Sequence, residues 1–243
     1  MTSLALAKGI GIARRLPATD VMVEAGQLVA VIGPNGGGKT SLLRSLARTE
    51  DAHGAVTVEG LDLDLATEAQ RRRLIAFMPA SRDAPWPVRV TDYVALGLEA
   101  PNPERTAYLI EQLELEPLAD RPIDRLSTGE RARAMLARAL AAKARLLLLD
   151  EPLSNLDPYW VLRTIDLVRS EIANNASSAL VSVHDLSLLD RFDRVLLVSD
   201  GCVVADDGPS AILECAQFGT AFRVEPVGRG WAISRRADPR SLR

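Results

Sequence analysis

The chain has 243 residues and a formal net charge of −3, with 29 Lys and Arg against 32 Asp and Glu. The basic excess that sequence-independent nucleic-acid binding requires is absent, so composition gives no support for a nucleic-acid partner. The two cysteines cannot build a disulfide framework, and no apolar run approaches the roughly 18 residues that a membrane-spanning helix needs. We therefore expect a soluble protein, and the N-terminal segment makes a poor signal peptide because charged residues interrupt it.

Strands and helices alternate along much of the chain. Four apolar runs predict strands that are buried on both faces: 28–32, 146–149, 179–183 and 195–198. Residues 41–48 and 130–143 carry apolar side chains at helical spacing. Strands that alternate with helices predict an α/β fold with a mainly parallel sheet.

The middle and the end of the chain depart from this alternation. Residues 81–140 are rich in proline and in helical patterns, which predicts a helical lobe inserted into a core formed by 1–80 and 141–215. Residues 216–243 predict a C-terminal hairpin that ends in a solvated basic tail. No repeat or linker divides the chain, so we expect a single domain over 1–243.

The first motif with a chemical interpretation follows the strand at 28–32. It reads Gly33-Pro34-Asn35-Gly36-Gly37-Gly38-Lys39-Thr40 and fits the phosphate-binding pattern G-x-x-x-x-G-K-[ST]. Glycines let successive backbone N–H groups converge on a phosphate, and the N-terminus of the following helix adds its positive dipole end. Lys39 would reach the β- and γ-phosphates, the Thr40 hydroxyl would ligate Mg²⁺, and Ser41 belongs to the same nucleotide-binding set. A glycine-rich turn with an incidental lysine is the alternative interpretation, and the flanking strand and helix argue against it.

Two carboxylates end the strand at 146–149. Ligands of open α/β sheets bind beyond the carboxyl ends of the strands, so Asp150 should face the same crevice as Lys39. Asp150 can then hold Mg²⁺, and Glu151 can take the proton from an attacking water. Many strands end in Asp-Glu without any such role, so the prediction depends on the pairing with the phosphate loop.

Two further features are ambiguous by themselves. In Leu126-Ser127-Thr128-Gly129-Glu130, Ser127 and Glu130 are spaced as a capping box that would start a helix. The same helix N-terminus, with its small residue and glycine, would also suit an anion. His184 follows the strand at 179–183, where a single histidine is more often structural than catalytic.

Taken in this order, the motifs resemble those of the ATP-binding subunit of ABC transporters over nearly the whole chain. Four segments carry the resemblance: the Walker A loop at 33–40, the signature motif at 126–130, the Walker B strand at 146–151 and the D-loop at 154–157. Thr128 replaces a glycine of the signature motif, and His184 is similar to the switch histidine. The resemblance implies a P-loop ATPase core with N-terminal antiparallel β elements and an inserted helical lobe.

The resemblance also implies that two chains work as a head-to-tail pair, most simply a homodimer. ATP and Mg²⁺ at the Walker A loop of one chain would be covered by Ser127 and Gly129 of the other chain. Glu151, His184 and Lys39 would act at the γ-phosphate. Closing and opening of the pair would drive integral membrane permease subunits, which places the chain in the cytoplasm, peripheral on the inner face of the cell membrane.

The segment 78–97 resembles the importer branch for iron–siderophore complexes, haem or cobalamin, and Trp86 within it would face the permease or pack inside the lobe. Two other functions remain open. One is a soluble ABC-type ATPase, for example one that serves iron–sulfur cluster assembly. The other is a degenerate nucleotide-binding subunit that regulates a partner and hydrolyses ATP weakly.

One departure from the family concerns a glutamine that follows the strand at 74–78 and contacts Mg²⁺ and the attacking water. Ala80 stands at that position and offers no side-chain oxygen, while Ser81 is one residue out of place. We therefore expect impaired turnover or coupling.

A second departure concerns the adenine base, which the family stacks on an aromatic residue near the N-terminus. This chain has no Phe, Tyr or Trp before Phe77. Arg14 or Arg15 could supply a guanidinium face instead, and Ile12 an apolar one. This substitution predicts weak discrimination between ATP and GTP.

Overall fold

A computed structural model of the chain describes residues 3–81, 87–227 and 230–233. The N-terminal part contains a four-stranded antiparallel sheet with the order β2-β1-β4-β5. Its strands are β1 (Ser3–Ile12), β2 (Leu16–Glu24), β4 (His53–Val58) and β5 (Leu61–Asp62). The expected N-terminal antiparallel β elements are therefore confirmed.

A second sheet has six strands in the order β10-β9-β3-β8-β7-β6. They are β3 (Leu28–Ile32), β6 (Ile75–Met78), β7 (Leu146–Leu149), β8 (Ser178–Ser182), β9 (Arg194–Ser199) and β10 (Cys202–Asp207). All neighbouring strands run parallel except β9 and β10. Every residue of β3, β7 and β8 is buried, as the uninterrupted apolar runs predicted for strands covered on both faces.

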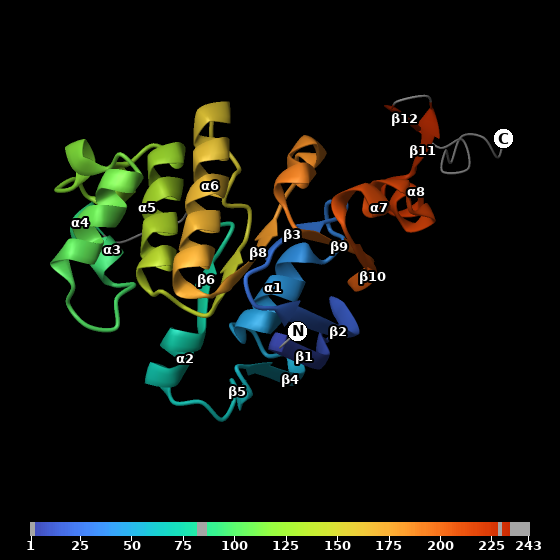
Figure 1. Cartoon of the computed structure of the whole chain (residues 1–243), viewed down its shortest axis with the longest axis horizontal. Coiled ribbons are helices and arrows are strands. Elements are labelled where there is room, and N and C mark those ends of the chain that lie inside the picture. Colours follow the sequence, from blue (N-terminus) through green and yellow to red (C-terminus); the bar gives the residue numbers. More distant parts are fainter. Residues whose placement is uncertain (1–2, 82–86, 228–229, 234–243) are drawn as a thin grey trace.

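The six-stranded sheet separates two hydrophobic cores. Helix α1 (Lys39–Ala47) lies between the two sheets, and its Leu42, Leu43 and Leu46 pack against one face of the larger sheet and against the antiparallel strands. The opposite face is covered by helices that include α5 (Thr128–Ala141) and α6 (Pro158–Asn175). The result is a layered α/β fold in which α1 starts at the carboxyl edge of β3 (Figure 1).

Helices make up most of the described residues between β6 and β7, as the proline-rich segment predicted. They are α3 (Val90–Ala95), α4 (Pro103–Gln112), the short turns η1 (Glu116–Leu118) and η2 (Ile123–Arg125), and α5. Figure 1 shows α3, α4 and α5 gathered at one side of the molecule, away from the antiparallel sheet. The limits of this lobe at 81 and 140, and the assignment of the whole chain to one domain, stay predictions. Trp86 lies outside the described residues.

Short elements complete the fold. They are α2 (Glu68–Leu74) before β6, η3 (Leu186–Arg191) before β9, α7 (Pro209–Glu214), α8 (Ala216–Phe222), and the antiparallel pair β11 (Val224–Val227) and β12 (Gly230–Ile233). In the described parts of the chain, every helix falls short of the length and apolar character that a membrane span requires.

The C-terminal hairpin segment was expected to begin at residue 216, and this is wrong because residues 216–222 form helix α8. Phe218 and Phe222 lie four residues apart on this helix, with ring centroids 4.7 Å apart, and Phe218 is only 1% exposed. Aromatic residues at this spacing share one helical face, a pattern that the alternation of the neighbouring residues obscures. The basic tail lies outside the described residues.

Candidate nucleotide-binding site

The residues of the phosphate loop line an open cavity of about 940 Å³. The loop contributes residues 35–41, and Glu151 and His184 line the same cavity from the ends of two other strands. Arg14 and Arg15, in the turn between β1 and β2, complete the wall together with the turn at 200–201. The sheet order explains this convergence, because β3, β7 and β8 are neighbours and end at the same edge.

Two glycines of the loop are required by its backbone. Gly33 has φ +152°, and a Cβ at this position would lie 1.9 Å from the carbonyl oxygen of Val198. Gly38 has φ +108°, and a Cβ there would lie 2.8 Å from the Cα of Gly201. Only glycine combines these angles with so close an approach of neighbouring backbone. The two glycines therefore allow the loop to follow this tight path beside the backbone at 198–201. Binding of phosphate by the N–H groups of the loop stays a prediction.

Lys39 is held by the loop that precedes it. Its Nζ donates hydrogen bonds to the carbonyl oxygens of Gly33 at 2.8 Å and Pro34 at 3.2 Å, and the residue is only 7% exposed. Burial lowers the pKa of the Lys39 ammonium, while the carboxylates of Glu151 and Asp150 act in the opposite direction. A phosphate in the cavity would give the buried Lys39 ammonium a further anionic partner.

Asp150 follows β7 and is completely buried. Its Oδ1 accepts a hydrogen bond of 2.8 Å from the hydroxyl of Ser182, whereas its Oδ2 has no hydrogen-bond partner among the described residues. A buried carboxylate oxygen without a partner is costly unless a cation binds it. Mg²⁺ prefers such oxygens and is commonly held by one or two protein ligands together with substrate phosphates. The Asp150 carboxylate and the Thr40 hydroxyl, which lines the cavity, therefore fit Mg²⁺.

Glu151 and His184 were predicted separately, and the structure brings them into contact. The Nε2 of His184 lies 2.9 Å from the Oε1 of Glu151. Glu151 has φ +51°, a left-handed conformation that is uncommon for a residue with a side chain. Both side chains remain partly exposed at the cavity. A carboxylate positioned in this way can accept a proton from water, and the imidazole can orient it.

Ser127 and Gly129 are not brought to this cavity, since neither is among the described residues that line it. They lie at the solvent-accessible N-terminus of α5. Ser127 Oγ accepts from the Glu130 N–H at 3.3 Å, and Glu130 Oε2 accepts from the Ser127 N–H at 2.8 Å. The capping box is therefore confirmed, and its bonds to Ser127 lower the pKa of Glu130. The second interpretation, contact with an anion, stays a prediction.

The contact of Arg14 or Arg15 with the adenine base stays a prediction. Both line the cavity, and Arg15 donates a hydrogen bond of 2.5 Å to Glu50, which also accepts one of 2.6 Å from Arg44. Ile12, the other candidate, is instead buried in the core below the antiparallel sheet.

Sequence reasoning missed Ser182. This residue is buried at the end of β8, and its hydroxyl contacts both residues of the Asp150-Glu151 pair. A signal for it exists in the sequence, because Ser182 interrupts an otherwise apolar run at 179–183. A hydroxyl in a strand that is buried on both faces needs a buried partner.

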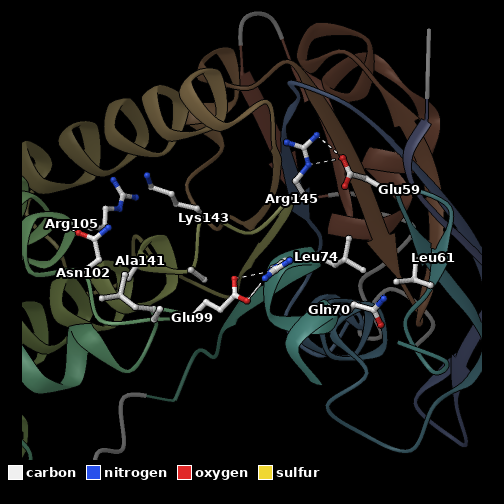
Figure 2. Close-up of a pocket in the computed structure, with 14 residues that line it drawn as sticks. Glu59, Leu61, Gln70, Leu74, Glu99, Asn102, Arg105, Ala141, Lys143 and Arg145 are labelled. Atoms are coloured by element: carbon white, nitrogen blue, oxygen red, sulfur yellow. Dashed lines mark hydrogen bonds and ion pairs between the residues drawn. The ribbon is translucent and has the colours of Figure 1, made fainter. Parts of the chain in front are cut away.

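A second cavity, of about 600 Å³, lies between α2, the start of α4 and the end of α5 (Figure 2). Two of its arginines are already paired within the protein, since Arg73 forms an ion pair with Glu99 and Arg145 forms one with Glu59 (Figure 2). It also lies at the amino ends of β6 and β7, which follow Arg73 and Arg145. Ligands of α/β sheets bind at the carboxyl ends, so the cavity at the phosphate loop is the better candidate site.

Comparison with known proteins identifies the family of the chain. Residues 16–154 match the ABC transporter family. The chain is 32% identical over 218 residues to the achromobactin transport ATP-binding protein CbrD of Dickeya dadantii, covering 85% of this chain and 81% of that protein. It is 37% identical over 227 residues to the aliphatic sulfonates import ATP-binding protein SsuB of Albidiferax ferrireducens, with coverages of 89% and 77%. It is 38% identical over 210 residues to the hemin import ATP-binding protein HmuV of Streptomyces coelicolor, with coverages of 81% and 74%.

A solved structure shows the same fold. It is described as a nucleotide-free ATP-binding cassette from an ABC transporter, and it superposes with a TM-score of 0.77. The match has 20% sequence identity and covers 94% of this chain and 100% of the cassette. The predicted α/β fold with a mainly parallel sheet is thereby confirmed.

Proposed function

The chain belongs to the ABC transporter family and is an ATPase, and from this premise we propose that it is the subunit that binds and hydrolyses ATP to energise an importer. One observation carries the proposal. A single cavity is lined by the phosphate loop with the buried Lys39 and by Glu151 and His184, which contact each other. Asp150, the residue before Glu151, is buried behind this lining, and its Oδ2 has no partner among the described residues.

The roles follow from the positions of the side chains. The N–H groups of the loop, Lys39 and Ser41 bind the phosphates. Thr40 and Asp150 would hold Mg²⁺, which would supply positive charge to stabilise the phosphates during transfer. Glu151 accepts the proton of the attacking water, and His184 orients the Glu151 carboxylate beside the γ-phosphate.

The position of the signature motif supports a head-to-tail homodimer. Ser127 and Gly129 are accessible at the N-terminus of α5 and do not contribute to the cavity of their own chain. The first N–H groups of a helix need partners and attract anions. In the proposed pair, this helix start covers the ATP that is bound to the other chain.

We expect the ATPase rate of the purified chain to rise more steeply than in proportion to its concentration, because each complete site needs two chains. Gly129→Asp is a suitable variant. An acidic residue is favourable in the first turn of α5, and a Cβ at Gly129 meets only an ordinary contact of 3.5 Å. The new carboxylate would repel the partner's triphosphate, so turnover should fall while nucleotide binding to the monomer persists. A rate strictly proportional to concentration and unaffected by Gly129→Asp would contradict the dimer.

The position of Ala80 supports the prediction that turnover is impaired. β6 is the parallel neighbour of β7, and the Asp150 N–H donates to the carbonyl oxygen of Met78 at 2.9 Å. Ala80, two residues beyond Met78, therefore follows the strand that adjoins the carboxylates, and its methyl group cannot bind water or Mg²⁺. We expect Ala80→Gln to raise kcat for Mg·ATP several-fold. Ala80→Leu is the control, because leucine is similar in size to glutamine but has no side-chain oxygen. An unchanged or lower rate for Ala80→Gln would show that the absent glutamine does not limit turnover.

A groove of about 230 Å³ supports the proposed contact with a permease. It runs along the edge strand β6 and is lined by Met78, Pro79 and Tyr93, with Leu96 beside them 61% exposed. We assign this groove to the permease, which makes the chain a peripheral subunit on the cytoplasmic face of the membrane. Relatives named for achromobactin, hemin and cobalamin support an iron complex, haem or cobalamin as the transported substrate. Relatives named for aliphatic sulfonates and for manganese make these substrates the alternatives.

A further inference from the structure

The hydroxyl of Ser182 bridges the two carboxylate residues of the candidate site. It donates to Asp150 Oδ1 at 2.8 Å and accepts the backbone N–H of Glu151 at 2.6 Å. We infer that Ser182 is a positioning residue, which aims Asp150 at the cation and holds Glu151 in its catalytic conformation. This inference rests on the proposed function and extends it to a residue outside the recognised motifs.

The sheet register places Ser182 for this role. Leu149 of β7 pairs with Val181 of β8, so the next residues, Asp150 and Ser182, lie side by side. In a parallel pair in register, neighbouring side chains point to the same face. On its other side β8 pairs with β3, with Val31 opposite Ser182. Ser182 therefore lies between the strand that leads into the phosphate loop and the strand that ends in the carboxylates.

The hydrogen bond from Ser182 gives the two carboxylate oxygens of Asp150 different roles. Because Oδ1 accepts the Ser182 hydroxyl, rotation of the carboxylate is restricted and Oδ2 is left without a protein partner among the described residues. Partners of this kind orient a ligating carboxylate and tune its affinity for the metal. Without the hydroxyl, Asp150 would lose its orientation and a second buried oxygen would lack a donor.

The second hydrogen bond acts on the backbone. Glu151 has φ +51°, an unfavourable conformation for a residue with a side chain. Its N–H is bound by Ser182, and the next turn is closed by the Ser154 hydroxyl, which donates to the Glu151 carbonyl oxygen at 2.9 Å. Strained conformations of this type persist only where neighbouring contacts hold them. Ser182 therefore helps to direct the Glu151 side chain toward His184.

A pair of isosteric variants tests the hydroxyl. Ser182→Thr keeps the hydroxyl and Ser182→Val replaces it with a methyl group, and both residues suit a strand. The first readout is Mn²⁺ binding in the presence of ADP, followed by electron paramagnetic resonance of the free ion. The second is kcat and KM for Mg·ATP. Ser182→Val should weaken Mn²⁺ binding and lower kcat by about 10- to 100-fold, with little change in KM because the loop still binds the phosphates. Ser182→Thr should stay close to wild type.

Ser178→Ala is the matched control. Ser178 is buried on the same strand and its hydroxyl also makes two hydrogen bonds, donating to the Glu24 carbonyl oxygen at 2.7 Å and accepting the Gln27 N–H at 3.3 Å. These contacts are far from the carboxylates, so Ser178→Ala should lower stability and leave Mn²⁺ binding unchanged. The inference is overturned if Ser182→Val retains the Mn²⁺ affinity of Ser182→Thr. It is also overturned if Ser178→Ala loses as much Mn²⁺ affinity as Ser182→Val. If the wild type binds ADP and Mn²⁺ but does not hydrolyse ATP, the proposed function fails, and the Mn²⁺ comparison still decides the role of Ser182.

Discussion

Replacing Glu151 with glutamine is expected to lower kcat for ATP hydrolysis by about 10²- to 10⁴-fold, the range typical of a lost general base. The amide has nearly the shape of the carboxylate but cannot accept the proton of the attacking water. Binding of ATP should persist, because the phosphate loop and Lys39 are unchanged. The dimer should even be favoured, since unhydrolysed ATP remains between the two chains.

Single-turnover hydrolysis and ATP-dependent dimerisation would be measured on the same sample. Glu104→Gln is the matched control, because Glu104 is also a carboxylate but lies exposed in the first turn of α4, outside the cavity and outside the signature motif. It should affect stability by about 1 kcal/mol or less and leave the chemical step nearly unchanged. Residual turnover above a tenth of wild type in Glu151→Gln would exclude Glu151 as the base and turn attention to His184.

Removing one partner of the ion pair between Arg105 and Glu171 is expected to destabilise the fold by about 3–5 kcal/mol, because an unpaired charge would remain buried. The Arg105 and Glu171 side chains are 9% and 4% exposed. Arg105 Nη1 donates to Glu171 Oε1 at 2.9 Å, and Nη2 donates to the Leu140 carbonyl oxygen at 2.8 Å. The pair therefore joins α4 of the helical lobe to α6 and to the end of α5.

Urea unfolding of Arg105→Ala, Glu171→Ala and the double variant would measure this effect. The double variant should lose less unfolding free energy than the two single variants lose together, since it leaves no isolated buried charge. Arg72→Ala is the control, because Arg72 pairs with Glu68 on the surface with side-chain exposures of 60% and 80%. Such pairs contribute about 0.5 kcal/mol or less. A loss of similar size in Arg105→Ala and Arg72→Ala would refute the structural role of the buried pair.

Much of the site follows from local sequence. The phosphate loop depends on glycines at positions with positive φ and on a lysine at a fixed offset, and these requirements can be recognised in a short segment. The strand that ends at Asp150 can be recognised because it is apolar throughout. The start of the C-terminal segment was predicted wrongly because helix α8 has only seven residues. So short a helix shows too little helical periodicity to be distinguished from the alternating pattern of a strand.

The α/β class and the capping box of α5 could be predicted, and the phosphate loop and the two carboxylates could be selected as candidates, because each depends on residues that are close in the chain. Which distant side chains meet depends on the folding of the whole chain. Ser182 contacts Asp150 across 32 positions, and Arg105 contacts Glu171 across 66. Hydrophobic periodicity gives the faces of strands and helices but not their order in the sheet. The order β3-β8-β7, set by packing of the whole core, is what brings Ser182 to the carboxylates and leaves Ser127 outside the cavity of its own chain.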